Sequence, residues 1–344
     1  MPRHPPEDGL RTDDPSVSTW IDRFVVEPAH EGWRLDRYLT AKLHRATRSQ
    51  VTRFLRGDVR VEGRDRVKAG MVVRSGDVVT IRRREARDPG APQTTALNPL
   101  WQDERVIVVD KPPGLLVHAT AHEGAWHVQA ILERCWPGER VEPMHRLDRD
   151  TSGCLLCARG LSAIQRFRRA FAENEITKHY AALVDDPGAR WVPGAHALLD
   201  TPLGFDRSSD VHLRIGVGAW PCRTHVRCVA RSSHIALLEV RIEGGRQHQI
   251  RAHLAMAGTP VVGDKLYGMG DAFFIAWRDT PGDEALSAKL ALRWHALHAA
   301  ALRWSLEGQA GHAASPLPRA WEALWPGVSA RWAARALTSQ SASP

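Results

Sequence analysis

The residues with the clearest chemical potential lie in MHRLDRDTSG, positions 144 to 153, where Asp148 stands between Arg146 and Arg149. The closing TSG is typical of a turn, and the apolar GCLLCA that starts at its glycine is typical of a buried strand. Asp148 should therefore lie on a loop at the edge of a sheet, a common location for catalytic groups. Because flanking arginines favour the ionised carboxylate, Asp148 could serve as a nucleophile or as a base.

The tetrapeptide RLDR inside this segment also occurs at positions 34 to 37. There it opens a predicted helix, with Leu35 directed inward and the three charged residues directed outward. An amphipathic helix readily has such a sequence, with one apolar residue among charged ones. Taken alone, the copy at 146 to 149 would likewise be an ordinary salt-bridged surface loop, so its assignment depends on the other motifs.

A second candidate group lies in EGGRQHQIRAHLAMAGTPVVGDKLYG, residues 243 to 268. A helix predicted to open near Gln247 would have an apolar face and an N-terminus able to bind an anion or a phosphate. Arginine and histidine alternate around this helix start, at Arg246, His248, Arg251 and His253. Two histidines five residues apart without a carboxylate partner are a poor zinc set, so we expect no metal here.

The segment KHYAALV, residues 178 to 184, predicts a strand in which Lys178 and Tyr180 point to the same face. A tyrosine at such a position is usually a half-buried packing residue. A role in chemistry would require the rest of the chain to place a pocket against that face.

Cysteine usage gives no sign of a disulfide framework or of a metal site. The five cysteines are an odd number scattered over 344 residues. Cys154 and Cys157 form a single C-x-x-C within an apolar run, and we interpret them as small core residues. A reducing compartment fits this pattern. Since the sequence has neither 18 consecutive apolar residues nor the apolar core of a signal peptide, we expect a cytoplasmic protein without a membrane span.

Length and local composition predict two folded domains. Residues 1–18, rich in proline, aspartate and serine, read as a disordered lead, and the proline-rich residues 85–99 read as a linker. A small module at 19–84 lies between them. The main, catalytic domain is expected at 100–315, followed by a C-terminal tail at 316–344.

The small module has its own pattern of helices and strands. Helical spacing predicts two short helices, at about 35–43 and 49–56. Short β-type runs follow at 59–61, 71–73 and 78–81, separated by glycine-containing turns. The module therefore reads as a small α/β domain.

Positive charge is concentrated in this module. From residue 31 to residue 85 there are 15 lysines and arginines against 7 acidic residues, a surplus equal to the +8 of the whole chain. Such a concentration suits a phosphate backbone, although a solvated basic surface would look the same. The candidate phosphate contacts are the arginines around the two predicted helices: Arg34, Arg37, Arg48, Arg53 and Arg56.

The main domain lacks the regular βαβ rhythm of a parallel sheet. Strands are predicted at 106–110 and 114–118 around a Lys-Pro-Pro-Gly turn, with a helix at 126–134. Residues 269–290 read as an extra loop, and residues 320–337 as a helix in the tail. The pattern favours an α+β domain with a mixed or antiparallel sheet.

Four segments of the main domain together resemble the RluA-type family of RNA pseudouridine synthases: VVDKPPGLLVH, HRLDRDTSG, KHYAALV and GRQHQIRAHLAMAGTPVVGDKLYG. They match in type, order and approximate spacing, and the basic module resembles the S-four type RNA-binding domain that many members carry. The resemblance covers roughly residues 33 to 305. It changes the assignment of the second RLDR from a surface loop to a catalytic segment.

The resemblance implies an isomerase that detaches uracil from its ribose at nitrogen, turns it and rejoins it through carbon, with no metal or cofactor. Asp148 matches the catalytic aspartate, and the resemblance leaves open whether its carboxylate attacks the sugar, attacks the base or abstracts a sugar proton. Tyr180 matches a tyrosine that packs against the target base and helps to remove the proton from its ring. Arg251 matches the arginine that pairs with the aspartate.

The same resemblance assigns the residues that would hold a flipped nucleotide. Ile250 matches an apolar residue lining the base pocket, Arg146 matches the arginine that fills the space left in the RNA, and His145 is grouped with them for substrate binding. These types fit the physics, since a base that leaves its stack needs an apolar wall and a group to replace it. A charged aspartate in such a pocket needs a paired cation.

The implied partner is RNA, bound by a monomer, with large-subunit rRNA the first choice of substrate and tRNA the alternative. Two other classes of function remain as competitors. A non-catalytic RNA-binding protein would use the basic module alone, and a hydrolase would use Asp148 as its nucleophile. Binding alone does not need a buried carboxylate, and no partnered general acid or base for hydrolysis is evident in the sequence.

Overall fold

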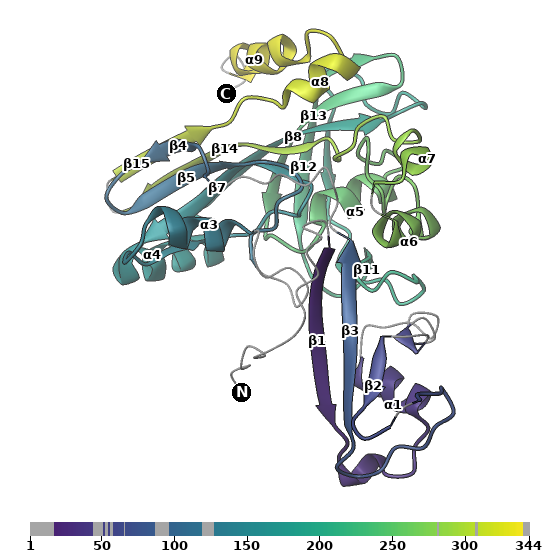
Figure 1. Cartoon of the computed structure of the whole chain (residues 1–344). Helices are drawn as coiled ribbons and strands as arrows, with labels where there is room; N and C mark the ends of the chain where they lie inside the picture. The colour runs from purple at the N-terminus through teal and green to yellow at the C-terminus, as the bar shows by residue number, and fades with distance from the viewer. Residues whose placement is uncertain are drawn as a thin grey trace. The chain divides into compact units, whose positions relative to one another are not determined.

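The computed structural model describes residues 17–43, 51, 54–55, 58–64, 66–86, 96–118, 127–280, 282–306 and 309–339. The chain divides into two compact units, Met1–Asp88 and Pro89–Pro344 (Figure 1). Each unit has its own hydrophobic core, and they are described in turn below as unit 1 and unit 2.

Unit 1 is a small three-stranded antiparallel sheet with one described α-helix. The strand order is β1 (Val17–Val25), β3 (Val78–Ala86), β2 (Val59–Val61). The helix α1 (Leu35–Lys42) follows the short 3-10 helix η1 (Pro28–His30). It buries Leu35, Tyr38 and Leu39, whose i, i+3, i+4 spacing forms one apolar face.

Three expectations for unit 1 have different outcomes. Strand β1, which was not predicted, begins inside the predicted disordered lead and pairs with β3 along its full length. The run at 71–73 is not a strand and contributes only an isolated bridge between Arg34 and Val72. Most of the predicted helix at 49–56 lies outside the described residues, as do Arg48, Arg53 and Arg56.

Unit 2 contains one mixed sheet, which in the described part of the chain has ten strands. Eight of them follow the order β4-β5-β7-β14-β8-β13-β12-β9, with β6 beside β7 and β15 beside β14. β14 pairs in parallel with β7, and the other described pairs are antiparallel. The α+β domain with a mixed or antiparallel sheet that the sequence predicted is therefore confirmed, and the sheet is mixed. The bounds are β4 Pro99–Gln102, β5 Val106–Lys111, β6 Val141–Pro143, β7 Ser152–Arg159, β8 Ile176–Asp185, β9 His196–Leu199, β12 Arg223–Ser232, β13 Ile235–Glu243, β14 Leu297–Leu306 and β15 Gln309–Ala314.

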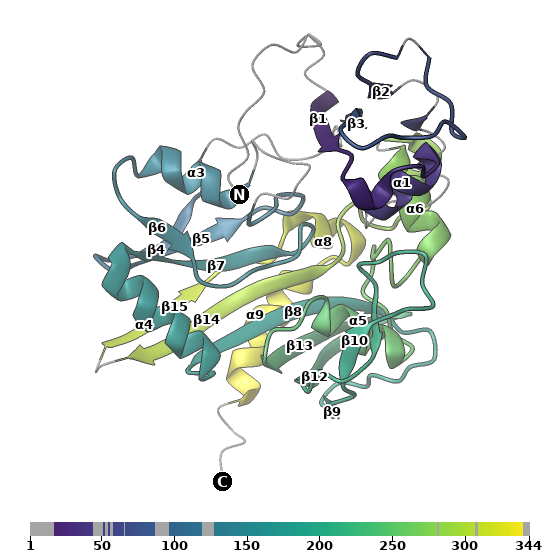
Figure 2. The ribbon, with the colours of Figure 1, turned by 90° about the horizontal axis from the view of Figure 1, so that it is seen from below.

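Helices cover both faces of this sheet. In Figure 1, α3 (Val128–Cys135) and α4 (Gly160–Ala172) lie below the strands, and α8 (Arg319–Leu324) and α9 (Val328–Ser339) lie above them. Seen from below in Figure 2, α4 lies in front of the strands and α9 behind them. Strands covered on both faces are apolar along their whole length, as β7 is in SGCLLCAR.

The C-terminal segment is part of the core of unit 2. The sequence favoured a tail with a single helix at 320–337, but the structure has two helices separated by Pro326 and Gly327. Trp321, Trp325 and Trp332 are buried in the main core cluster. The aromatic side chains bury more apolar surface than the polar composition of the segment suggested.

Two further expectations for unit 2 were wrong. Residues 114–118 form no strand and contribute only a bridge between Leu116 and His127. The segment is an irregular loop that buries alternate apolar side chains, and this alternation is the same pattern that a strand would give. The supposed loop at 269–290 contains α6 (Asp271–Asp279) and α7 (Glu284–Ser287), and Asp283 caps α7 by accepting a hydrogen bond from Leu286 N at 2.9 Å.

The hairpin β10 (Leu203–Phe205) and β11 (Ile215–Val217) forms a separate two-stranded sheet. It packs through Leu203 and Ile215 on the helix α5 (Gln249–Met256) and on α6. In the chain, this hairpin connects the edge strand β9 to its neighbour β12 in the main sheet.

Cys154 and Cys157 are fully buried in two different core clusters, as expected for packing residues of β7. Within the described residues, no group of histidine, cysteine, aspartate or glutamate side chains could hold a metal ion. The described helices include none with the length and apolar character needed to cross a membrane.

Candidate active site

Asp148 lies on the loop between β6 and β7, and this loop is fixed at several points. Leu147 is buried in the main core cluster, and Thr151 N donates to Asp148 O at 3.2 Å. Nε2 of His145 accepts a hydrogen bond from Leu156 N at 3.0 Å, and the ring stacks on Phe171. Burial lowers the pKa of His145 to about 3, so its ring is neutral and anchors the loop to β7.

Lys111, at the end of β5, holds the same loop from the other side. Its Nζ donates to three carbonyl oxygens, Arg149 O at 2.9 Å, Leu115 O at 2.7 Å and Pro112 O at 3.0 Å. The side chain is fully buried, and burial lowers its pKa to about 7. Lys111 thereby joins the Lys-Pro-Pro-Gly turn to the residue that follows Asp148.

The backbone around Gly153 requires the glycine that ends the TSG segment. Its φ is +105°, and a Cβ atom there would collide with the backbone carbonyl of Ala299. Ala299 is its partner in the parallel pairing of β7 with β14. Only glycine allows the two strands to approach so closely directly after the Asp148 loop.

Arg251, on α5, joins two carboxylates in a buried ion-pair chain. Its Nη1 donates to Asp148 Oδ2 at 2.9 Å, while Nε and Nη2 donate to the two oxygens of Asp264 at 2.6 and 2.9 Å. Asp264 is fully buried, and its Oδ1 also accepts the backbone N–H groups of Leu266 and Tyr267 at 3.0 Å each. The bidentate pair orients the guanidinium, so that Nη1 faces Asp148.

Asp148 is held in its ionised form. Burial opposes ionisation, but the adjacent positive charges outweigh it and lower the pKa of Asp148 well below its usual range. His248 and Arg251 both face the carboxylate, but burial lowers the pKa of His248 to about 4. Arg251 is therefore the charge that persists at neutral pH, where its own pKa is raised by the two carboxylates.

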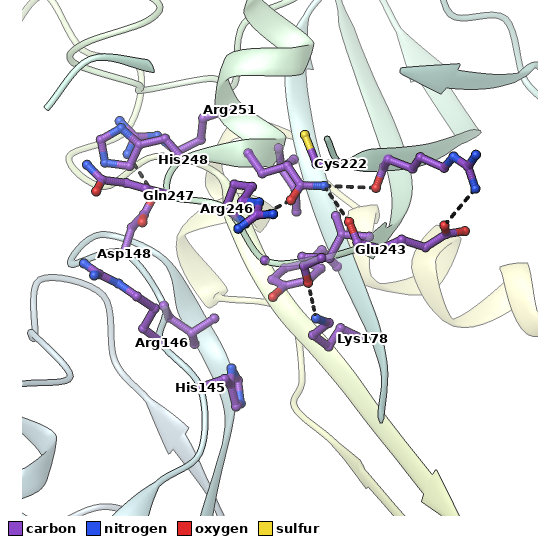
Figure 3. Close-up of a pocket in the computed structure, with 18 of the residues that line it drawn as sticks. His145, Arg146, Asp148, Lys178, Cys222, Glu243, Arg246, Gln247, His248 and Arg251 are labelled. Carbon is purple, nitrogen blue, oxygen red and sulfur yellow. Dashed lines mark hydrogen bonds and ion pairs between the residues drawn. The ribbon is translucent and has the colours of Figure 1, made fainter. Parts of the chain in front are cut away.

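A cavity of about 830 Å³ opens beside this chain. It brings together the residues predicted for the site, and Figure 3 shows Arg146 and Asp148 lying close to each other on one side of it. Tyr180 and Ile250 are buried in its wall, at 6% and 4% exposure. The cavity is lined by all six residues predicted for catalysis and substrate binding: His145, Arg146, Asp148, Tyr180, Ile250 and Arg251.

Tyr180 is a neutral phenol in this environment. Burial raises its pKa, and the nearby negative charge of Asp148 raises it further. Arg146, by contrast, is exposed, and it makes no hydrogen bond or ion pair with the residues that the structure describes. One face of the cavity is thus aromatic and apolar, and a free cation stands at its opening.

The structure adds two site residues to those predicted. Asp264 was not selected, although the sequence places this carboxylate in the GDKLYG segment, thirteen residues after Arg251. Lys178 lines the cavity on the same face of β8 as Tyr180, as the strand period predicted, and donates to Gly244 O at 2.6 Å. It lies 5.9 Å from the centre of the Phe171 ring.

The helix predicted to open near Gln247 begins at Gln249, after His248 in the left-handed conformation with φ of 53°. Gln249 is buried, and its amide donates to the backbone oxygens of Arg223 and Glu243. These bonds hold the start of α5 against β12 and β13, which directs Ile250 and Arg251 into the cavity.

In unit 1, two of the predicted RNA contacts lie within the described residues. Arg34 precedes α1 and pairs with Asp36 through Nε and Nη2 at 3.2 and 2.7 Å. Arg37 stacks over the Trp33 ring at 4.0 Å. The first RLDR therefore starts a helix, with Leu35 buried, as the sequence predicted.

The fold of unit 2 is that of RNA pseudouridylate synthases. The solved structure of Human RNA Pseudouridylate Synthase Domain Containing 1 superposes with a TM-score of 0.53 at 20% sequence identity. The match covers 74% of this chain and 98% of the human chain.

Sequence comparison defines the family. The family model described as RNA pseudouridylate synthase matches residues 105–256. Ribosomal large subunit pseudouridine synthase C of Vibrio vulnificus is 30% identical over 303 residues, covering 84% of this chain and 90% of the relative. Ribosomal large subunit pseudouridine synthase D of Xanthomonas campestris pv. campestris is 33% identical over 312 residues, covering 87% and 89%. The chain belongs to this family and is an RNA pseudouridine synthase, an isomerase, which confirms the resemblance described from its motifs.

Proposed function

We propose that this synthase isomerises uridine in large-subunit ribosomal RNA, with Asp148 as its catalytic carboxylate. The substrate is supported by the curated relatives, which are by name ribosomal large subunit pseudouridine synthases. Transfer RNA is the alternative substrate. The rest of the proposal follows from the geometry of the cavity.

The catalytic assignment rests on one observation: the two carboxylate oxygens of Asp148 differ in their hydrogen bonding. Oδ2 accepts from Arg251, whereas Oδ1 accepts no hydrogen bond from the residues that the structure describes. The carboxylate is therefore ionised and oriented by one oxygen while the other is available to a substrate in the cavity. A nucleophile and a base both need such an oxygen.

Base flipping is supported by the composition of the cavity. A uridine inside an RNA stack cannot expose its glycosidic bond, so it has to leave the stack. Tyr180 and Ile250 offer an apolar wall for the extruded uracil. Arg146, exposed and unpaired among the described residues, would occupy the gap in the RNA.

The reaction breaks the bond from C1′ to N1 of uracil and forms a bond from C1′ to C5. The proton on C5 is lost and N1 gains one, so no atoms are added or removed. Because burial raises the pKa of Tyr180, its neutral phenol suits packing against the base. Removing the C5 proton through Tyr180 would require the phenol to ionise, which burial disfavours.

Unit 1 would supply contacts to RNA phosphates that position the substrate without reading its sequence. The charge surplus between residues 31 and 85 supports this role. Arg37, exposed in part and stacked on Trp33, is the described candidate. Arg34 is already paired with Asp36, so to contact an RNA phosphate it would have to share its guanidinium between the phosphate and Asp36.

The test is the substitution Asp148→Asn, which keeps the size of the side chain and removes the charge. Purified protein is incubated with ribosomal RNA from cells lacking the gene, and new pseudouridines are mapped. We expect conversion by the unmodified protein and a loss of at least about a thousandfold in the variant.

Asp36→Asn is the matched control, because it changes the aspartate of the other RLDR. It should keep its turnover at saturating RNA. Conversion by Asp148→Asn at the unmodified rate would overturn the catalytic assignment. Pseudouridine in transfer RNA alone would replace the substrate, and release of free uracil would indicate a hydrolase.

A further inference from the structure

The hairpin β10–β11 carries an unusual share of the exposed apolar surface. Of the ten large apolar residues that are exposed in the described structure, three lie on or within this hairpin. They are Phe205, Leu213 and Val217, at 54%, 49% and 70% exposure. Scattered exposed apolar residues need no explanation, but a group on one small element indicates an interaction surface.

An aromatic pair is fixed at the base of the hairpin. The rings of Phe205 and Trp220 meet edge to face, with centroids 5.1 Å apart. Trp220 is held by two backbone hydrogen bonds with Leu203, at 2.8 and 3.0 Å. We call Phe205, Leu213, Val217 and Trp220 the hairpin surface.

The hairpin is held rigidly on unit 2. A Cβ atom at Gly218 would collide with the backbone of Gly204, so the two glycines close the neck of the hairpin. Arg214 Nη1 donates to Asp271 Oδ1 on α6 at 2.7 Å, and Ile215 N donates to Tyr267 OH at 2.9 Å. A rigid aromatic surface binds with little loss of conformational entropy.

The hairpin adjoins residues that line the catalytic cavity. Pro202 and Pro221, which flank the hairpin in the sequence, both line that cavity. Gln247, also in its lining, donates from Nε2 to Leu213 O at 3.3 Å. In Figure 2 the hairpin strand β10 lies beside α5, which carries Arg251. An RNA whose uridine enters the cavity on this side would bring a neighbouring nucleotide close to the hairpin.

The charges near the hairpin surface favour RNA as its occupant. Arg207 on the hairpin loop and Arg246 at the cavity are exposed, and neither forms an ion pair within the described part of the chain. Of the acidic residues near the hairpin surface, Asp206 and Asp271 are within ion-pair distance of Arg214, and Asp210 is exposed on the hairpin loop. Aromatic rings beside unpaired cations are the usual combination for single-stranded nucleic acid.

We propose that the hairpin surface binds an unpaired nucleotide adjacent to the target uridine, by stacking its base on Phe205 and Trp220. This inference rests on the proposed function, because it assumes that the uridine enters the cavity beside Asp148. It adds a second base contact, which would help to select the RNA without taking part in the chemistry.

The test uses a short RNA that contains the uridine mapped in the ribosomal RNA experiment. Phe205→Ala should raise the KM for this RNA about 5- to 150-fold and leave kcat unchanged, as loss of one stacked base predicts. Phe205→Tyr should restore the KM. Leu161→Ala is the control, since Leu161 is 58% exposed on α4 and does not line the catalytic cavity.

A second measurement detects the stacking itself. With 2-aminopurine placed on either side of the uridine, binding to the Asp148→Asn protein should quench its fluorescence, and adding Phe205→Ala should remove the quenching. An unchanged KM and unchanged quenching in the Phe205→Ala proteins would overturn the inference while conversion by the unmodified protein upholds the proposed function. A defect confined to ribosomal particles, absent on free RNA, would also overturn it, because the surface would then contact protein. Failure of the unmodified protein to convert any RNA would instead reject the proposed function.

Discussion

Arg251 pairs with two carboxylates, Asp264 and Asp148, and its hydrogen bonds to them differ in number. Asp264 takes two guanidinium N–H groups and is further stabilised by two backbone N–H groups. Asp148 receives one N–H and keeps an oxygen toward the cavity. Asp264 therefore orients the cation, and the cation keeps Asp148 charged in a buried setting where it would otherwise be costly.

This ion-pair chain predicts how stability responds to acid. Both carboxylates have a pKa below the usual value of about 3.9 in the folded protein. Their contribution is therefore complete above that pH, and it is lost as the pH falls toward the lowered values. Urea unfolding followed from pH 6 to pH 3 should show a steep loss of unfolding free energy.

The variant Asp264→Asn should be less stable by about 3–5 kcal/mol at neutral pH, because it leaves Arg251 without its main partner. Its stability should also fall less between pH 5 and pH 3, since one depressed carboxylate is missing. Asp185→Asn, at an aspartate whose side chain is 52% exposed, is the control and should behave as the unmodified protein. An acid response identical in the two variants would contradict the assignment.

At the scale of elements, the Asp148 loop is defined by the strands that enter and leave it. Its following strand β7 pairs with β14 in parallel, and Ser152 and Thr151 hydrogen-bond to the buried His298 and His295 at 2.8 Å each. Burial lowers the pKa of both histidines to about 4, so they act as neutral partners at physiological pH. Side chains as well as backbone thus tie the loop to β14, through His298, and to the segment just before β14, through His295.

Gly153→Ala tests this arrangement. A side chain at φ of +105° is strained and would also collide with Ala299, so we expect a loss of at least about 2 kcal/mol in unfolding free energy. Turnover of the folded fraction should fall as well, because the shifted strand carries Asp148 with it. Gly138→Ala is a matched control, since Gly138 has φ of +81° but nothing within 4 Å of the added atom. Equal losses in the two variants would show that close strand approach is unimportant.

At the scale of the whole molecule, charge and chemistry belong to different units. The basic surplus lies between residues 31 and 85, within unit 1, whereas the residues that line the cavity all belong to unit 2. Phosphate contacts release counterions and make binding depend on salt, while base contacts do not. The contribution of unit 1 to affinity should therefore be visible in the salt dependence.

Arg37→Ala should weaken RNA binding, because it removes one cation from unit 1. The slope of log affinity against log salt should become shallower by about 0.7 to 0.9, as expected for one lost phosphate contact. Filter binding with the Asp148→Asn background measures this without conversion of the RNA. Arg303→Ala, which removes an exposed arginine from β14, matches the change in net charge and should leave the slope unaltered. The same change of slope in both variants would show that it follows from net charge alone, and it would contradict a phosphate contact by Arg37.

Local sequence patterns predicted many elements well. Helix α1 and strands β5, β7 and β8 were predicted from their apolar residues. The spacing of these residues reflects which side chains are buried, and it is visible within a short window of sequence. The predictions failed where tertiary packing decided the backbone. Residues 114–118 bury Leu115 and Val117 without forming a strand, and the supposed loop at 269–290 contains helices, of which α6 buries Trp277.

The sequence by itself determined the family and named six residues that line one cavity, because the motifs keep their spelling and order. Only the tertiary structure decided that Asp264 completes the pair between Asp148 and Arg251, which lie 103 positions apart. The difference between the two copies of RLDR was already predicted, and the structure agrees with it, since one copy opens α1 and the other leads into β7. The physical reason is that burial and hydrogen-bond partners are set by segments distant in the chain, which no local pattern contains.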